Sequence, residues 1–163
     1  MKITELYIKN FGRFSEQHFY IKDGVQVIYG ENEYGKSTLQ AFIRAMLFGM
    51  ERGRGKAAAK DDFSKYQPWE NPNYYAGVMR FRCGNRNFRL ERSFDRISKQ
   101  VSLVCEDDGE ELSVEHGDLD ILLGGITPGM YDNTVSIKYA DRKSGSARNA
   151  ETDLVCRLLL EKK

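Results

Sequence analysis

Short apolar runs rich in β-branched and aromatic residues predict three strands near the start of the chain. Residues 3–9 form the first and end at the turn sequence Asn10-Phe11-Gly12-Arg13, and a second runs from about residue 14 to 21. The third, Val25–Tyr29, is nearly all apolar, as a strand buried on both faces of a sheet should be. We therefore expect residues 25–29 to form a central strand.

A single apolar stripe predicts the most regular helix of the chain. From Ser37 onward, apolar residues recur at i, i+3, i+4, i+7, i+8 and i+11, which is the spacing of one helical face. These residues are Leu39, Phe42, Ile43, Met46, Leu47 and Met50. Residues 51–65 lose this period and fill with Gly, Ala, Lys, Arg and Asp, which predicts an exposed loop.

The second half of the chain predicts short elements. Alternating apolar residues between 75 and 94, interrupted at Gly84-Asn85, indicate a β-hairpin, and residues 101–105 indicate a further strand. The other expected elements are a helix over 115–123, a helical turn opened by Thr127-Pro128, a strand over 135–137 and a helix over 150–163.

Composition indicates one soluble domain of ordinary charge. The chain has 163 residues, of which 40% are hydrophobic and 30% charged, and its formal net charge of +1 excludes a polycationic nucleic-acid binder. Three scattered cysteines and two distant histidines argue against a disulfide framework, a zinc site and a histidine-based triad. Neither a signal peptide nor an apolar run of membrane-spanning length occurs, so we expect a cytoplasmic protein without membrane contact.

The sequence Gly30-Glu31-Asn32-Glu33-Tyr34-Gly35-Lys36-Ser37 matches the phosphate-loop pattern G-x-x-x-x-G-K-[ST] in full. It follows an expected strand and opens an expected helix, which is the context that this loop requires. Successive backbone N–H groups of such a loop, including those of Glu33 and Tyr34, form a nest for anions, and the helix N-terminus adds partial positive charge.

The side chains of the motif predict a nucleoside triphosphate with Mg²⁺ as the ligand. Gly30 and Gly35 let the backbone fold closely around phosphate, and Lys36 would reach the β- and γ-phosphates as a point charge. The Ser37 hydroxyl would be a ligand of the Mg²⁺ ion between those phosphates, with Thr38 as a second hydroxyl. ATP and Mg²⁺ are therefore the expected cofactors.

Hydrolysis also needs an acidic residue at the end of a second buried strand, which holds the metal, and a group that orients water. One segment of the chain has a similar pattern. Residues 101–108 end an apolar run in carboxylates, but Ser102 interrupts the run and Asp108-Gly109 is a turn signal. They form either a metal-binding strand or, in the interpretation we favour, a strand that runs into a solvated acidic turn. In residues 118–123 the acids precede the apolar residues, which is the wrong order. We therefore identify no catalytic residue.

Two groups of surface candidates leave alternative interpretations open. The basic group is Arg52, Arg54, Lys56, Lys60, Arg80, Arg82, Arg86 and Arg89. It could contact a DNA backbone, although a solvated sheet face and a soluble loop explain it as well. The aromatic group is Tyr66, Trp69, Tyr74 and Tyr75. It could stack nucleic-acid bases, although a packed surface loop is the simpler interpretation.

The order of these features resembles the N-terminal half of the ATPase head of the SMC-like family, which includes RecF, RecN and SbcC, and in particular its YhaN-like AAA-type members in Firmicutes. The segments that carry the resemblance are MKITELYIKNFGRF, GVQVIYG, GENEYGKST, LQAFIRAMLFG and KYQPWENPNYYAGVMRFRCGNRNFRLERSF. The resemblance covers about residues 1–137. It implies an α/β P-loop NTPase fold, namely the N-terminal lobe of an ABC-ATPase-like head with an added antiparallel β lobe, and it leaves residues 138–163 as an atypical tail.

The same resemblance implies an ATPase whose head is built from two halves. In such proteins a C-terminal half and a coiled coil complete the head, ATP joins two heads into a dimer, and DNA ends or a partner nuclease are engaged. The implied role is ATP binding, followed by hydrolysis once the head is completed, in DNA double-strand break repair or recombination. Asn32 would line the phosphate loop, and Arg13 would lie near the nucleotide.

One departure from the family limits the activity that we expect. The family places a metal-sensing glutamine just after the strand equivalent to residues 134–137, but Lys138 and Tyr139 follow here. We therefore expect the chain alone to bind nucleotide weakly and to hydrolyse it poorly. The alternative is a non-catalytic nucleotide-binding interaction module. A small-molecule kinase is a further alternative, for which residues 52–60 make a poor lid.

Overall fold

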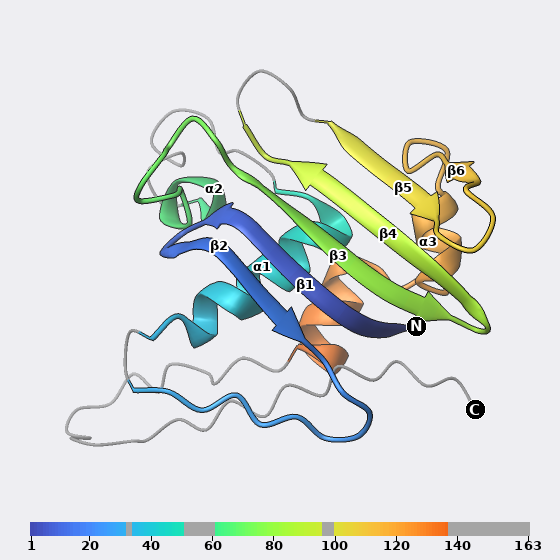
Figure 1. Ribbon diagram of the computed structural model, residues 1–163, viewed down its shortest axis with the longest axis horizontal. Coiled ribbons are helices and arrows are strands. Elements are labelled where there is room, and N and C mark those ends of the chain that lie inside the picture. The colour runs from blue at the N-terminus through green and yellow to red at the C-terminus, as the bar shows by residue number, and fades with distance from the viewer. Residues whose placement is uncertain (32–33, 51–60, 96–99, 137–163) are drawn as a thin grey trace.

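One antiparallel sheet organises the part of the chain that the computed structural model describes, which is residues 1–31, 34–50, 61–95 and 100–136. Its six strands lie in the order β2-β1-β3-β4-β5-β6 (Figure 1). They are β1 (Lys2–Phe11), β2 (Phe14–Tyr20), β3 (Ala76–Cys83), β4 (Arg86–Ser93), β5 (Val101–Cys105) and β6 (Glu111–Leu112).

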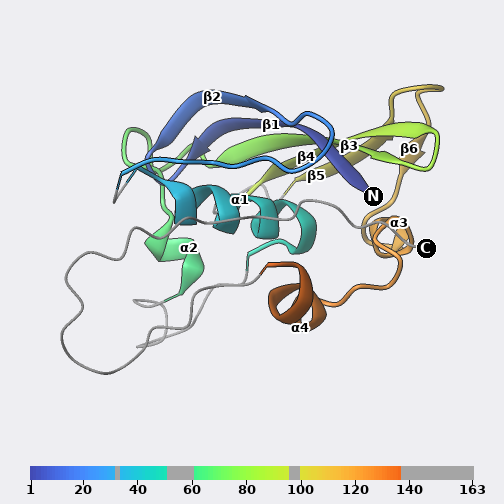
Figure 2. The ribbon, with the colours of Figure 1, turned by 90° about the horizontal axis from the view of Figure 1, so that it is seen from below.

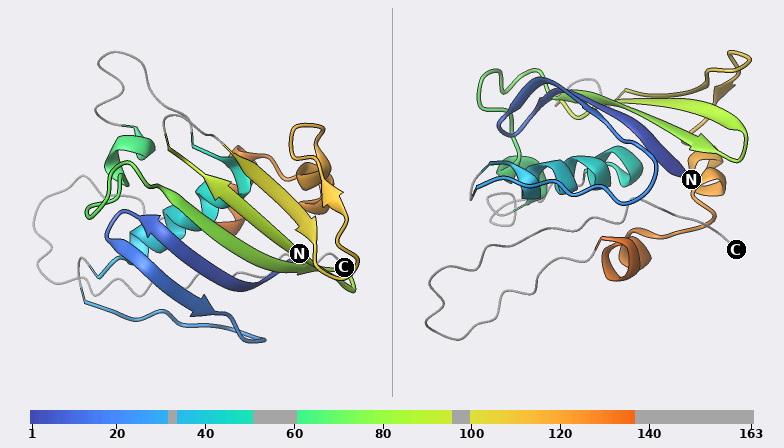
Figure 3. Two further views of the ribbon diagram at one scale, coloured as in Figure 1. Left: turned by 45° about the horizontal axis from the view of Figure 1, so that its top comes forward. Right: turned by 60° about the horizontal axis from the view of Figure 1, so that its bottom comes forward.

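The described helices all lie on one face of this sheet, so the molecule has two layers (Figures 2 and 3). The long helix α1 lies directly under the central strands, with the shorter helices around it. The helices are α1 (Lys36–Phe48), α2 (Asp62–Lys65), α3 (Asp118–Leu122), α4 (Pro128–Met130) and the π-helical turn η2 (Tyr131–Val135). None of them is long and apolar enough to cross a membrane.

The two faces of the sheet differ in chemistry because side chains alternate along each strand. Leu6, Met79 and Leu90 are fully buried on the face that carries the helices. The opposite face carries charged side chains such as Arg80 and Glu91. A sheet with one apolar and one solvated face is the usual antiparallel arrangement.

The contact between α1 and the sheet depends on a glycine. The Phe42 ring of α1 lies over Gly77 of β3 so closely that a Cβ atom added there would come within 2.3 Å of the ring. Phe42 is fully buried and also packs edge-on against Phe11 of β1, with ring centroids 5.3 Å apart. The absent side chain at residue 77 therefore allows α1 to lie close against the central strands.

Most of the expected elements are present. The strands at 3–9, 14–21 and 101–105, the hairpin between 75 and 94 and the helix that begins near residue 37 are all confirmed, with small shifts at their ends. The hairpin turns at Gly84, whose φ of 59° suits glycine. The helical turn after Thr127 is also confirmed, because the Thr127 hydroxyl caps α4 by accepting the N–H of Met130.

The prediction of a buried central strand at residues 25–29 is wrong for the described structure. This segment belongs to no strand and runs from β2 to α1 without joining the sheet (Figure 1). Val25, Val27 and Tyr29 are 69%, 66% and 70% exposed. A strand buried on both faces needs neighbouring strands, and no described strand lies beside this one.

The prediction of a strand at residues 135–137 is also wrong where the structure describes it. Residues 131–135 form η2, in which the N–H of Ser136 donates to the Tyr131 carbonyl at 2.8 Å. Contacts with α1 hold this turn: Asp132 pairs with Arg44, and the buried Gln40 amide donates to the Ser136 hydroxyl at 2.6 Å. These tertiary contacts outweigh the β propensity of the local sequence.

Smaller differences concern short elements. The helix expected over 115–123 begins only at Asp118, because the Asp118 carboxylate accepts the Ser113 N–H at 2.7 Å and holds the preceding residues in a turn. The loop expected over 51–65 ends in helix α2, which the Asp61 side chain caps. Strand β6 was not expected. The helix expected over 150–163 lies outside the described residues.

Replacing Gly77 by alanine should destabilise the protein, because the new methyl group would overlap the Phe42 ring. We expect a loss of about 1–3 kcal/mol in the free energy of unfolding, measured by urea denaturation. Gly129→Ala is the matched control, since a Cβ atom there would meet nothing within 4 Å. Equal stability of the two variants would contradict the role assigned to Gly77.

Arg44 and Asp132 should show measurable coupling, because their pair is bidentate and partly buried. Arg44 Nε and Nη2 donate to the carboxylate at distances of 2.8 to 3.1 Å. A double-mutant cycle of Arg44→Ala and Asp132→Ala should give a coupling energy of about 1–2 kcal/mol in urea unfolding. The exposed pair of Arg86 and Asp108 is the control, and its coupling should be smaller. Equal coupling in both cycles would refute the stabilising role of the Arg44 pair.

Candidate functional site

The phosphate-loop motif lies at the N-terminus of α1, as predicted. Gly30 and Glu31 precede the helix, Tyr34 and Gly35 lead into it, and Lys36 is its first residue. Gly35 is the N-cap and has φ of 100°, a left-handed conformation that favours glycine. Residues 32 and 33, which carry the predictions for Asn32 and Glu33, lie outside the described residues.

The first turn of α1 presents backbone donors that have no partner within the helix. The first helical hydrogen bond joins the Leu39 N–H to the Gly35 carbonyl at 2.9 Å, so the N–H groups of Lys36, Ser37 and Thr38 have no partner within the helix. The first turn contains no acidic residue, and no side chain caps it. In a helix of 13 residues, this end attracts anions.

The Lys36 side chain folds back over its own loop. Its ammonium group donates to the backbone carbonyls of Gly30 and Glu31, the latter at 3.0 Å. The charge is therefore held by neutral acceptors within the loop. A phosphate group placed in the loop would offer the ammonium a stronger, charged acceptor.

The turn between β1 and β2 packs against this loop. A Cβ atom added at Gly35 would lie 2.5 Å from the Phe14 ring and 3.0 Å from Arg13 Cδ. Gly12 approaches Thr38 as closely, since an added Cβ atom would lie 2.8 Å from its methyl group. The turn thus places Arg13 beside the phosphate loop, and its position near the nucleotide, which the family resemblance implies, stays a prediction.

Two exposed rings flank the Arg13 guanidinium. Its Cζ atom lies 5.6 Å from the centroid of the Tyr34 ring and 6.0 Å from that of the Trp69 ring. The sequence interpretation considered Trp69 only as part of a packed loop or a site for nucleic-acid bases. The structure instead brings Trp69 next to Arg13 and the β1–β2 turn through contacts across the chain, which local sequence patterns do not reveal.

The acidic residues after β5 do not form a metal-binding strand. The Asp107 carboxylate accepts the backbone N–H of Asn87 at 2.6 Å and also its side-chain amide, and these bonds hold the pKa of Asp107 below its usual range. Asp108, in the same turn, pairs with Arg86 of β4. The favoured interpretation of a solvated acidic turn is confirmed. Among the described residues, no group of three or more His, Cys, Asp or Glu side chains could hold a metal ion.

The basic residues of the sheet are largely compensated by acids. Arg80 donates to Glu106 at 2.9 Å and to Glu5 at 2.5 Å, and these bonds raise the pKa of Arg80. Arg89 lies 4.0 Å from both Glu91 and Glu106. This favours the solvated-face interpretation over a DNA contact at these residues. The basic residues between 51 and 60 lie outside the described part of the chain.

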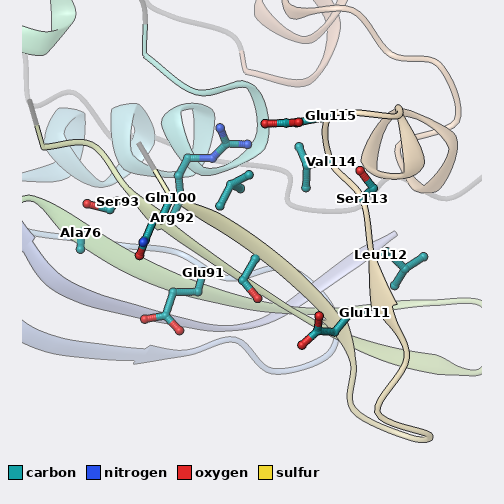
Figure 4. A pocket seen from close by; sticks show the side chains of 12 residues that line it. Ala76, Glu91, Arg92, Ser93, Gln100, Glu111, Leu112, Ser113, Val114 and Glu115 are labelled. Carbon is teal, nitrogen blue, oxygen red and sulfur yellow. The ribbon is translucent and has the colours of Figure 1, made fainter. Parts of the chain in front are cut away.

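One hollow of the described structure lies away from the phosphate loop. It has a volume of about 880 Å³ and is lined mostly by residues of β4, β5, β6 and the segment after β6 (Figure 4). Arg92 reaches from its wall to the end of α1, where Nε donates to the Met46 carbonyl at 3.1 Å, and burial lowers the pKa of Arg92. Glu91, Glu111 and Glu115 also line the hollow, which makes it unsuited to a polyphosphate.

Comparisons with known proteins identify a family and several relatives. The AAA domain family matches residues 5–152. The "Uncharacterized protein YhaN" of Bacillus subtilis is 38% identical over 80 residues, which are 48% of this chain and 7% of YhaN. The "DNA double-strand break repair Rad50 ATPase" of Thermoplasma volcanium is 26% identical over 121 residues, which are 74% of this chain and 13% of that protein. This chain therefore matches only a small part of either relative.

A solved structure shares the fold. It is described as "Structural biochemistry of ATP-driven dimerization and DNA stimulated activation of SMC ATPases", and it superposes with a TM-score of 0.53 at 18% identity, over 85% of this chain and 87% of that chain. This likeness shows an SMC-type ATPase head fold. With the family match over most of its length, the chain belongs to the AAA domain family of P-loop ATPases.

Proposed function

We propose that this domain binds ATP with Mg²⁺ at the phosphate loop and forms the N-terminal half of a composite SMC-like ATPase head. The observation that carries the proposal is the uncapped N-terminus of α1, which opens directly from the phosphate-loop motif and is held against the β1–β2 turn. Family membership supports nucleotide binding in general. We propose that this lobe spans residues 1–137 and that residues 138–163 lie beyond it.

The loop residues have distinct proposed roles. The loop amides, with Gly30 and Gly35 as its flexible points, would surround the phosphates, and Lys36 would exchange its carbonyl acceptors for phosphate oxygens. Ser37 is exposed at the start of the helix, so its hydroxyl is accessible to a bound Mg²⁺ ion. The ion would neutralise charge that develops between the β- and γ-phosphates.

The exposed segment 25–29 supports a composite head. Its alternate side chains Val25, Val27 and Tyr29 face solvent although the sequence has the composition of a buried strand. A C-terminal head half that placed strands beside it and packed against its exposed face would bury these side chains. The small share of the relatives that this chain matches is consistent with a missing half.

The biological role comes from the relatives. The Rad50 relative is named for DNA double-strand break repair, and the solved SMC ATPases are described as dimerising with ATP and being stimulated by DNA. We extend to this chain a role in DNA double-strand break repair or recombination, with ATP-driven pairing of two heads, a coiled coil that joins the head halves, and a nuclease as the partner that acts on DNA.

A non-catalytic nucleotide-binding module is the second candidate. It is favoured by the absence of a metal-binding acid cluster from the described residues and by the solvated acidic turn after β5. In that case ATP would only organise a surface for a partner.

Lys36→Ala should strongly weaken ATP binding, because it removes the one cationic side chain that the phosphate-loop motif supplies to the β- and γ-phosphates. Isothermal titration calorimetry with MgATP should show affinity at least about 100-fold weaker than that of the unaltered chain. Lys22→Ala is the control, since Lys22 is exposed after β2. This variant should bind ATP normally. Unchanged affinity in Lys36→Ala would show that the loop does not hold the nucleotide.

A further inference from the structure

Trp69 is an aromatic side chain whose exposure needs an explanation. It is the single tryptophan of the chain, and it is 73% exposed. Tryptophan rings usually bury most of their surface, because an exposed ring forgoes a large hydrophobic gain. The preceding Pro68 is buried, so the loop itself packs on the domain while the ring projects from it.

The backbone around Trp69 is fixed to the β1–β2 turn. The Trp69 N–H donates to the Gly12 carbonyl at 3.0 Å, and the Gly12 N–H donates to the Tyr66 carbonyl at 2.8 Å. The Tyr66 ring in turn stacks on the buried Phe11, with centroids 5.7 Å apart. These contacts hold the exposed ring at a defined place rather than on a free loop.

That place adjoins the phosphate loop. The same β1–β2 turn packs Gly12 against Thr38 and Phe14 against Gly35. The Arg13 guanidinium lies between the Trp69 ring and the Tyr34 ring, which is 64% exposed. A continuous surface therefore leads from the N-terminus of α1 through Tyr34 and Arg13 to Trp69.

The chemistry of this surface suits a flat, electron-rich ring. Exposed aromatic faces stack nucleobases of any sequence, and the planar guanidinium of arginine stacks on aromatic rings and contributes cation–π attraction. A ligand that carried polyphosphate at one end and a purine at the other would occupy the helix N-terminus and the aromatic surface together. A nucleoside triphosphate has both groups.

We infer that Trp69, Arg13 and Tyr34 form the nucleobase platform of this domain, with Trp69 stacking on the base of the bound nucleotide. The inference rests on the proposed function, because it takes the phosphates to bind at the loop. A single-stranded nucleic acid would also stack on Trp69, but the sheet arginines Arg80 and Arg89 are already paired with acids and offer no track for its backbone along the sheet. One nucleotide is therefore the occupant.

The single tryptophan provides a direct reporter. We expect MgATP to change the intrinsic fluorescence of the full chain saturably, because the base contacts the only emitting indole. Magnesium tripolyphosphate has the phosphates without a base. It should bind, as measured by calorimetry, and leave the fluorescence largely unchanged.

Variants at the platform separate stacking from phosphate binding. Trp69→Ala should weaken MgATP binding about tenfold in calorimetry, because one stacking contact is lost, and should leave tripolyphosphate affinity unchanged. Trp69→Phe keeps an aromatic face and should retain most of the affinity. Tyr74→Ala is the control, because Tyr74 is a second exposed aromatic residue of the same loop and lies outside the platform. This variant should bind both ligands normally.

The outcomes distinguish this inference from the proposed function. If tripolyphosphate and ATP both bind but Trp69→Ala has no effect on either, the platform is refuted while the phosphate loop stands. If Trp69→Ala weakens both ligands equally, its role is structural and the platform is likewise refuted. If neither ligand binds to the unaltered chain, the proposed function fails and the platform fails with it. A fluorescence change with oligothymidylate that MgATP does not compete away would assign the ring to single-stranded DNA instead.

Discussion

The close approach of the Phe42 ring to Gly77 sets the position of α1, and the functional surface depends on that position. A side chain at residue 77 would move the helix away from β1 and β3. The helix would then lose its fit to the β1–β2 turn, where Gly12 and Gly35 leave room for Thr38 and Phe14. Close-packed protein interiors transmit small shifts, so a displacement of α1 at Gly77 would also displace the phosphate loop.

Helix α1 also joins regions that are distant in sequence. Its first turn holds the phosphate loop, its middle packs on the sheet, and its outward side binds η2 through Gln40 and Arg44. At its far end, Arg92 of β4 satisfies the Met46 carbonyl that the helix end would leave without a partner. A change at the phosphate loop is thereby connected, through one rigid element, to the 131–136 segment and to the sheet.

The sequence predicted those features that depend on local patterns. The apolar stripe from Leu39 predicted α1, alternation predicted the hairpin, and the spacing of Gly30, Gly35 and Lys36 predicted the loop at a helix start. Tertiary context decided the rest. Residues 25–29 have the composition of a buried strand without described neighbours, and residues 131–135 form a π-helical turn because α1 supplies partners for their polar groups. The neighbourhood of Arg13 and Trp69 arises from backbone bonds between segments far apart in sequence, which no periodicity encodes.

The turnover of ATP by the purified chain, at a concentration that saturates binding, most directly tests whether this domain is one half of an active site. It should be measured before and after addition of a separately expressed C-terminal half of an SMC-like head, such as that of YhaN. If the domain is one half of the active site, the chain alone should turn ATP over at the background rate, and the rate should rise clearly on mixing. Lys36→Ala in this chain should abolish that rise. Full turnover by the chain alone would contradict it, because the proposal places the acidic strand that holds the metal in the other half of the head.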